Sequence, residues 1–459
     1  MPVSLEIPTE APAAPAAAVG PCPKGELLLR VLDLLDREEI PYCLLHGYDQ
    51  YPQNIPGDVD CLIPQSFMPG RLAKVLHAFR EEIGAQVVQW FEDGAHFIVL
   101  AGRGEDGSPV LLQLHVATRY TMAGRVFFEA RDIISARRRH EQFWVTAPAV
   151  EFACILANRV AKADLTDNHA RRLSQLHALD PAACDYHTQR LLPKSAAVVI
   201  KAAGNDNWEA VRGSMQSLKH ELLSNPAAPS EGFCPRTYAK KIARWIRPRN
   251  GFHAVFLGPD GVGKSTTIES FQRDLSPVFL STLYLTFAPG LLPQKFAPPK
   301  PDGPHSLPPR SLPASLLKAG WWLVCYTVGY LLSIHPTLAR GGMVVNHRYL
   351  VDAIVDQKRY RYSGPVWLLR MIWMVAPKPD VVFLLDAAPE IIQQRKQEVS
   401  FAETAAQVHA YRNVIGKLQM GMVIDAAQPR PQVAAKVEWI VLDRLAARVA
   451  RRFCKGGLA

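Results

Sequence analysis

The chain has 459 residues, of which 48% are hydrophobic and 20% charged, and it carries 52 Lys and Arg against 42 Asp and Glu. This apolar content excludes an intrinsically disordered protein, and the length predicts two or three domains, each large enough for its own core. The net charge of +10 would suit a nucleic-acid-binding protein only if the bases covered one binding face.

The N-terminal residues 1–23 are rich in alanine and proline. They lack a basic start followed by an apolar core, so they are not expected to be a signal peptide and instead predict a disordered arm. The eight cysteines of the chain form no CxxC pair. This usage indicates reduced thiols, a cytoplasmic location and no zinc site.

The residues after the arm predict a mixed α/β unit. Glu26–Glu39 has helical periodicity, whereas Tyr42–Leu45 and Val59–Ile63 are short apolar runs typical of strands. His96–Leu100 and Val110–Val116 flank the turn-rich sequence GRGEDGSP, which predicts a hairpin.

This unit contains a glycine turn followed by two acids in DxD spacing. Gly47 precedes Asp58 by eleven residues, and Asp58 and Asp60 enter an apolar run. Because side chains alternate along a strand, the two acids share one face and can ligate one Mg²⁺ together. The alternative is a solvated acidic pair. The pattern resembles the nucleotidyltransferase family, but His115 stands where the third carboxylate is expected, and Tyr48 follows the glycine in place of a small residue.

From Pro148 to about Ser224 the pattern is helical, and a linker follows. Six bases lie within residues 236–249 and five more within 444–455, with no acid in either segment. Without them, 41 bases remain against 42 acids, so the rest of the chain is nearly neutral. We therefore expect no nucleic-acid partner, and expect these segments to be solvated or to attract phosphorylated ligands or anionic lipid.

The most specific motif is GPDGVGKST, which follows an apolar run and opens a helical sequence. Its glycines let backbone N–H groups surround a phosphate, Lys264 adds a charge, and the Ser265 hydroxyl can ligate Mg²⁺. The motif predicts binding of ATP with Mg²⁺, against the alternative of a chance match. The predicted cofactor-binding residues are Gly258, Asp260, Gly261, Val262, Gly263, Lys264, Ser265 and Thr266.

The sequence from Phe252 to Met420 resembles thymidylate kinases. The resemblance rests on the Asp within the phosphate-binding loop, the apolar run Met343–Tyr349 that ends in His-Arg-Tyr, and the run Pro379–Glu390. It is closer still to thymidylate-kinase-like proteins encoded with bacterial polysaccharide genes, which share a proline-rich segment and the run Lys358–Tyr362.

The resemblance implies that Ser265 holds Mg²⁺ and that four side chains are catalytic. These are Lys264 on the β- and γ-phosphates, Asp260 facing the phosphoryl acceptor, Arg348 on the acceptor's phosphate, and Arg395 in a lid. Relatives carry Asp where this chain has His347, and imidazole is a poor ligand for Mg²⁺. An active kinase and a protein that binds ATP without turnover are therefore both open.

Ala319–Ala339 contains no charged residue and is long enough to span a bilayer. The phosphate-binding loop precedes it and Arg348 follows it, and one phosphate site needs both on the same side of a membrane. We therefore expect a buried helix of the kinase-like domain, with contact at a membrane surface as the alternative.

The predicted fold class is α/β: a P-loop kinase domain with a parallel sheet, preceded by a smaller α+β nucleotidyltransferase-like domain and a helical segment. The expected ranges are 1–23 for the arm, 24–147 for the nucleotidyltransferase-like domain, 148–225 for the helical segment, 226–250 for the basic linker and 251–459 for the thymidylate kinase-like domain.

The expected function is ATP- and Mg²⁺-dependent phosphoryl transfer to a nucleotide, nucleoside or sugar phosphate, in surface-polysaccharide synthesis. The alternatives are an ATP-binding regulatory or scaffold protein and a nucleotidyltransferase with metal ligands Asp58 and Asp60. The expected location is the cytoplasm, with peripheral contact at the inner membrane as a second option. A homodimer is left open.

Overall fold

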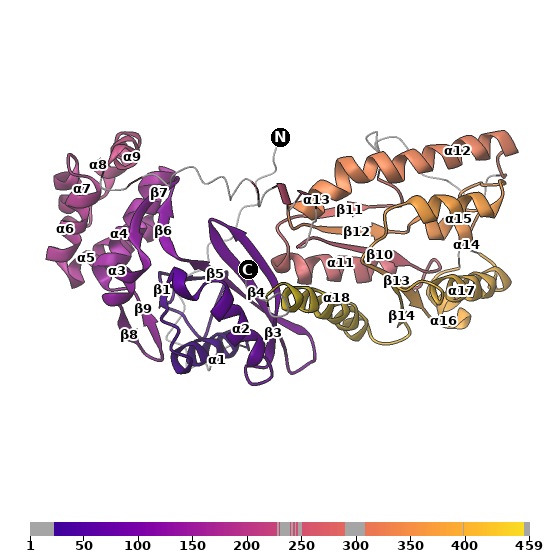
Figure 1. Cartoon of the computed structure of the whole chain (residues 1–459), viewed down its shortest axis with the longest axis horizontal. Helices are drawn as coiled ribbons and strands as arrows, with labels where there is room; N and C mark the ends of the chain where they lie inside the picture. The colour runs from indigo at the N-terminus through magenta and orange to yellow at the C-terminus, as the bar shows by residue number, and fades with distance from the viewer. Residues whose placement is uncertain are drawn as a thin grey trace.

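The computed structural model describes residues 23–453 except for 227, 228, 230–238, 240, 241, 244, 247–249, 290–307 and 398. The predicted arm up to residue 22, most of the basic linker and most of the proline-rich segment lie outside the described residues. The described chain is mixed α/β, as predicted, with a mixed sheet of seven strands, a parallel sheet of five and a small sheet of two (Figure 1).

The N-terminal sheet has the strand order β3-β4-β5-β2-β1-β9-β8. Its strands are β1 (Cys43–Leu44), β2 (Val59–Leu62), β3 (Ala85–Asp93), β4 (Ala95–Arg103), β5 (Pro109–Ala117), β8 (Arg138–His140) and β9 (Phe143–Val145). β4 and β5 pair antiparallel, which confirms the predicted hairpin. β2 and β5 run in parallel, and their register places Asp60 opposite His115.

Helix α1 (Pro23–Arg37) covers this sheet and confirms the predicted helical periodicity. Leu28, Val31 and Leu35 recur at helical spacing and are buried in one cluster with Leu100 of β4. The other elements of this part are the 3₁₀ turn η1 (Gln65–Phe67), α2 (Gly70–Ala78), β6 (Arg119–Met122), β7 (Arg125–Glu129) and α3 (Ala130–Ser135).

The helical pattern predicted after Pro148 is confirmed by six helices. They are α4 (Pro148–Lys162), α5 (Asp167–Leu179), α6 (Pro181–Leu191), α7 (Ala196–Asn205), α8 (Glu209–Gly213) and α9 (Met215–Ser224). α4 packs against α5, α6 and α9, and it therefore buries side chains on most of its circumference, including Phe152 and Leu156. Figure 1 shows these helices at the end of the molecule away from the parallel sheet.

The C-terminal sheet is parallel throughout, as predicted, in the order β11-β12-β10-β13-β14. Its strands are β10 (Phe252–Leu257), β11 (Thr282–Leu285), β12 (Met343–His347), β13 (Val381–Asp386) and β14 (Gly421–Asp425). All six residues of β10 are buried, as a central strand covered on both faces requires.

Alternate residues of β10 face two different helical layers. Ala254 and Phe256 belong to one apolar cluster with α11 and α18, whereas Val255 and Leu257 belong to another with α12, α14, α15 and α17. These helices, with the short η2 and α16, are α11 (Lys264–Leu275), η2 (Ser276–Val278), α12 (Leu312–Val324), α14 (Leu350–Val355), α15 (Val366–Val375), α16 (Pro389–Arg395), α17 (Phe401–Ile415) and α18 (Arg430–Phe453).

The prediction of a buried helix at Ala319–Ala339 is wrong. The segment belongs to a continuous helix, Leu312–Ala339, that comprises α12, a π-helical stretch η3 (Cys325–Ile334) and α13 (His335–Ala339). Only 33% of its most apolar stretch is buried, because Ala319 and Trp322 pack toward the sheet while the opposite face is exposed. Among the described residues, this is the one helix whose length and apolar composition would be enough to cross a membrane.

One apolar core joins the two sheets. Val88, Val99 and Ala101 of β3 and β4 are buried in the same cluster as α11, α18 and β10. α18 packs on β3, and the Trp439 indole donates to the Gly107 carbonyl at 2.9 Å. Helix α18 therefore lies between the parallel sheet and the N-terminal sheet (Figure 1).

Candidate functional site

The loop between β10 and α11 has a positive φ, which favours glycine, at Gly258, Gly261 and Gly263. Gly258 has a φ of 140°, and a Cβ there would lie 2.6 Å from the Leu385 carbonyl oxygen. Gly263 has a φ of 106° and directly precedes Lys264, the first residue of α11. Among the described residues no side chain caps α11, so its first N–H groups and positive dipole end face the loop. This is the arrangement in which backbone amides hold a phosphate.

The Lys264 side chain is folded back over this loop. Its ammonium donates to the Gly258 and Pro259 carbonyls at 2.9 and 2.7 Å and lies 3.4 Å from the Asp260 carboxylate. Lys264 is only 5% exposed. A phosphate oxygen would bind this ammonium more strongly than the carbonyls do, because a hydrogen bond between two charged groups is stronger than one to a neutral acceptor.

A pocket of about 580 Å³ opens in front of the loop. Its lining includes the predicted residues Asp260, Gly261, Val262, Gly263, Lys264, Ser265 and Thr266 but not the predicted Gly258. The lining also includes His347, Arg395, Lys396, Gln428 and Arg430. The structure thus brings the predicted loop residues to one hollow, and Ser265 is exposed to it.

Asp260 forms ion pairs with two arginines. Arg348 contacts one of its carboxylate oxygens and Arg359 contacts the other, while Lys264 lies 3.4 Å from the first. Three cations therefore surround one carboxylate that is itself 23% exposed. Arg348 and Arg359 also pair with Asp352 and Asp356, so three carboxylates formally balance the three cations at this edge of the loop.

Arg348 is fixed by the fully buried Asp352. The Arg348 guanidinium donates to both Asp352 oxygens at 2.9 and 2.8 Å, and the hydroxyls of Tyr360 and Tyr411 donate to the same carboxylate. Burial opposes the charge of Arg348, but Asp352 together with Tyr411 and Tyr360 outweighs burial, so the pKa of Arg348 is raised. Arg348 also has a φ of 75°, and its N–H donates to the Phe256 carbonyl at 2.9 Å. The guanidinium is thus permanently charged and rigidly placed.

Arg395 ends α16 on the wall of the pocket. Its guanidinium donates to the Val262 carbonyl at 3.3 Å and to the Ala426 carbonyl at 2.9 Å. Arg395, which the resemblance assigns to a lid, is therefore hydrogen-bonded to the backbone of the phosphate-binding loop.

His347 ends β12 beside the loop, where its register partner is Phe256 of β10. Burial, followed by the charges of Lys264 and Arg348, lowers the pKa of His347 to about 4. The imidazole is therefore neutral at pH 7. Its Nε2 atom is buried and has no hydrogen-bond partner among the described residues.

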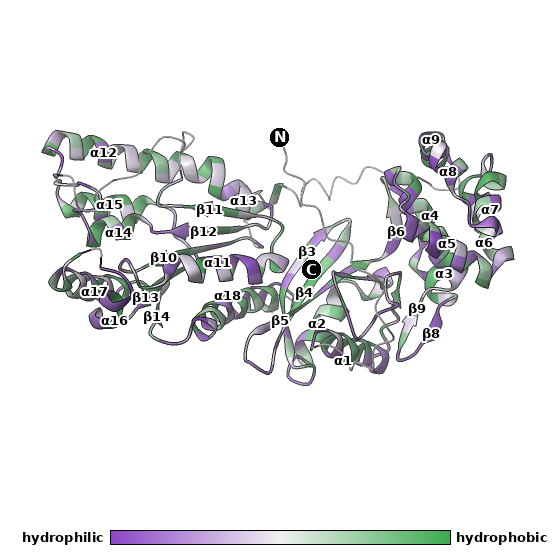
Figure 2. Cartoon of the chain, turned by 180° about the vertical axis from the view of Figure 1, so that it is seen from behind, coloured by the Kyte–Doolittle hydropathy of each residue, from purple (hydrophilic) through white to green (hydrophobic). Residues whose placement is uncertain are grey.

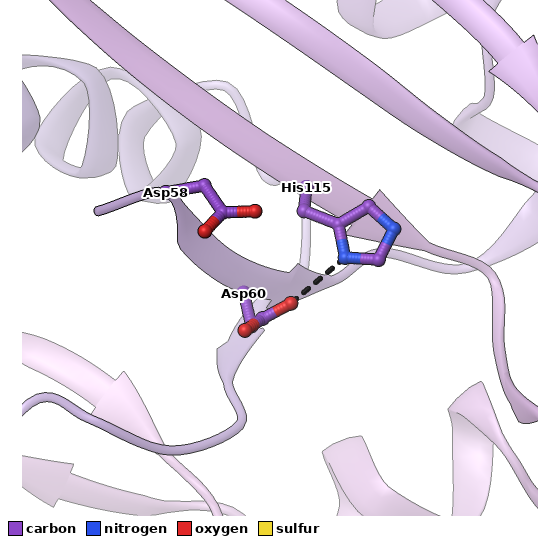
Figure 3. A group of neighbouring side chains, drawn as sticks. All are labelled: Asp58, Asp60 and His115. Carbon is purple, nitrogen blue, oxygen red and sulfur yellow. Dashed lines mark hydrogen bonds and ion pairs between the residues drawn. The ribbon is translucent and has the colours of Figure 1, made fainter. Parts of the chain in front are cut away.

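A second cluster lies in the N-terminal sheet. Ligand atoms of Asp58, Asp60 and His115 all lie within 4.8 Å of one another (Figure 3). His115 Nδ1 lies 2.8 Å from one Asp60 oxygen, and His46 Nε2 lies 3.5 Å from the other. The hydrogen bond to Asp60 raises the pKa of His115. Burial opposes ionisation of Asp60, but His115 and His46 lower its pKa. The predicted shared face of Asp58 and Asp60 and the predicted position of His115 are confirmed.

Tyr48 explains how the turn after Gly47 tolerates a large residue. The Tyr48 ring is buried, and its hydroxyl donates to Glu151 of α4, which also pairs with Arg172 of α5 at 2.7 Å. The helical segment thereby completes a small pocket of about 210 Å³ that includes His46, Gly47, Arg159 and Arg172.

Some residues of these sites are not predicted by the sequence. Arg359 lies in a run that the resemblance singled out, but nothing in the sequence shows that it approaches Asp260. Gln428, just before α18, and Arg430, its first residue, carry no local sequence signal that would place them at the pocket. No protein-family model matches this chain, and no curated protein matches it.

Proposed function

We propose that this protein is an ATP- and Mg²⁺-dependent phosphotransferase that acts on a nucleotide, nucleoside or sugar phosphate, in surface-polysaccharide synthesis. The observation that carries the proposal is that two phosphate-binding devices meet at Asp260. Lys264 of the glycine loop and Arg348 both contact one oxygen of this carboxylate, and Arg359 contacts the other. A kinase that acts on a phosphorylated acceptor needs this combination, because it must hold a triphosphate and an anionic acceptor next to each other.

The architecture supports a P-loop kinase fold for residues 251–459. The loop lies at the carboxyl end of a central strand of a parallel sheet and at the amino end of the following helix. Ligands of open α/β sheets bind at that edge. The N-terminal part is proposed to have a nucleotidyltransferase-like fold on the basis of the Asp58 and Asp60 arrangement.

In this mechanism the protein positions charges and does little covalent chemistry. Lys264 and the first amides of α11 hold the β- and γ-phosphates, and Arg395 faces the same pocket. Arg348 and Arg359 hold the acceptor's anionic group, while Asp260 accepts hydrogen bonds at the junction. The Ser265 hydroxyl fits Mg²⁺, which would neutralise phosphate charge when bound. Asp260 is the single carboxylate among the described residues that line the pocket.

The test is a screen of acceptors with ATP and Mg²⁺. Nucleoside monophosphates, nucleosides, sugars and sugar phosphates are each incubated with the protein, and both ADP and the phosphorylated acceptor are measured. At least one acceptor class should stimulate ADP release above the rate without acceptor. ADP release that is the same in wild type and Lys264→Ala would contradict the kinase proposal.

A second candidate is an ATP-binding regulatory or scaffold protein with little turnover. The observation that favours it is His347, a neutral imidazole whose Nε2 has no hydrogen-bond partner among the described residues, at the position where the thymidylate kinases that the sequence resembles carry Asp. If this substitution has silenced the site, His347→Asp should raise Mg²⁺-dependent turnover at least about tenfold, since a carboxylate is the better ligand for Mg²⁺ and its waters. His347→Asn, which adds no charge, is the matched control. If His347→Asp turns over ATP no faster than wild type, the hypothesis that His347 has silenced the site is contradicted.

A third candidate is nucleotidyl transfer at Asp58 and Asp60. The observation that favours it is the meeting of these carboxylates with His115 within 4.8 Å, a donor set whose carboxylates suit Mg²⁺ or Mn²⁺ and whose imidazole suits Zn²⁺. Asp58→Ala should abolish pyrophosphate release from a nucleoside triphosphate and a sugar phosphate. Asp33→Ala, which removes a carboxylate with 73% of its side chain exposed, is the control. If both variants match wild type in every activity measured, the N-terminal site is not a nucleotidyltransferase site.

A further inference from the structure

Two packed helices expose apolar stripes on the layer that contains α12 and α15. On the helix Leu312–Ala339 the stripe comprises Leu317, Trp321, Val324, Val328, Leu331 and Leu332. These residues recur at spacings of three and four, so they share one side of the helix. Leu317, Leu331 and Leu332 are exposed to 77%, 60% and 68%. Figure 2 colours long stretches of this helix as hydrophobic.

Helix α15 continues the surface. Trp367, Met371, Met374 and Val375 are exposed at helical spacing, with Met374 at 69%. Leu369 and Ile372 on its other side are buried in the cluster that also holds Ala319 and Trp322 of α12. The exposed stripes of the helix Leu312–Ala339 and of α15 are called the apolar face below. Ordinary protein surfaces expose apolar residues singly, whereas the apolar face gathers many of them on two packed helices.

The charge around the apolar face has one sign. The sequence contains no Asp or Glu in residues 303–351 or 357–379, which include both helices. Arg310, Arg340, Arg370 and Lys378 are exposed within these ranges. Apolar side chains with tryptophans, on two segments that carry bases and no acid, match the boundary between the acyl chains and headgroups of an anionic bilayer.

We propose that the apolar face binds the surface of an anionic lipid bilayer. The helix Leu312–Ala339 lies along the membrane plane and does not cross it, because its other side is packed through Ala319 and Trp322 on the sheet that holds the phosphate-binding loop. A second copy of the chain is the less suitable occupant, since pairing two such faces would bring like charges together without an acid between them. The inference is independent of the phosphotransferase proposal.

The experiment is vesicle co-sedimentation of the full chain. Vesicles of phosphatidylcholine alone are compared with vesicles of equal parts phosphatidylcholine and phosphatidylglycerol. Wild type should bind the anionic vesicles, and binding should weaken in high salt. The double variant Leu331→Glu, Leu332→Glu should bind at least about tenfold less, because it places two acids on the stripe. Leu179→Glu on α5, whose leucine is 67% exposed, is the matched control and should bind like wild type.

A second variant separates the charge from the apolar area. Arg370→Glu, Lys378→Glu leaves both stripes intact and should weaken binding to the anionic vesicles. Equal binding to neutral and anionic vesicles, or equal binding of the Leu331→Glu, Leu332→Glu variant and wild type, would overturn the proposal. The proposal would also be overturned if wild type did not bind vesicles but formed dimers, measured by light scattering, and the Leu331→Glu, Leu332→Glu variant did not. The occupant of the apolar face would then be a second copy of the chain.

Discussion

Lys264→Ala is expected to lower ATP turnover by a factor on the order of 100 to 1000, the loss that follows removal of one preorganised charged donor. Lys264 is buried and its ammonium lies between the two carbonyls of Gly258 and Pro259 and the Asp260 carboxylate. When ATP binds, the same ammonium would reach the β- and γ-phosphates, where charge develops during transfer. The rate of ADP formation with the best acceptor measures the effect.

Lys417→Ala is the matched control, because Lys417 is exposed and lies outside the lining of the loop pocket. It should keep wild-type turnover. Thermal unfolding of both variants separates a catalytic effect from a loss of fold. A folded Lys264→Ala protein with turnover within a factor of about two of wild type would contradict the role assigned to this loop.

Asp352→Ala is expected to lower the free energy of unfolding by about 3–5 kcal/mol, the usual cost of removing one partner of a buried ion pair. Asp352 is fully buried and accepts hydrogen bonds from Arg348, Tyr360 and Tyr411. Its loss leaves two buried hydroxyls without this acceptor and leaves Arg348 to share the Asp260 carboxylate with Arg359. Urea unfolding monitored by circular dichroism gives the change.

The control for this variant is Asp33→Ala. Asp33 pairs with Arg37 at 3.3 Å, but 73% of its side chain is exposed, so its removal should change stability by less than about 1 kcal/mol. If Asp352→Ala costs no more than Asp33→Ala, the buried network does not hold Arg348. Asp352→Asn keeps the shape and should still destabilise, because it removes the charge that faces the guanidinium.

The features predictable from the sequence were those that local pattern determines. The spacing of Gly258, Gly263 and Lys264 predicts a loop between strand and helix, since the backbone there requires glycine. The alternation around Asp58 and Asp60 predicts their shared face. The position of His115 was predictable because Val110–Val116 is the apolar strand that follows in the hairpin, and the structure pairs it with β2.

The features that could not be predicted depend on distant packing. Ala319–Ala339 lacks charge on every side, so its sequence does not distinguish a helix buried all round from one with a single buried stripe. Arg359 meets Asp260 across 99 residues of chain, and no periodicity encodes that approach. β3 was missed because its core-facing residues include Gln89, whose amide donates to the Asn250 carbonyl at 2.8 Å.

The core shared by β3, β4, α11 and α18 has a consequence for how the protein can be divided. A fragment that starts at residue 251 would lose Val88, Val99 and Ala101, which are buried against those helices. Arg452 would also lose Glu92, its partner at 2.8 Å. Such a fragment would expose to water an apolar surface that is buried in the full chain. The two sheets are therefore expected to melt as one cooperative unit, and evolution is expected to inherit them together and not shuffle them as separate modules.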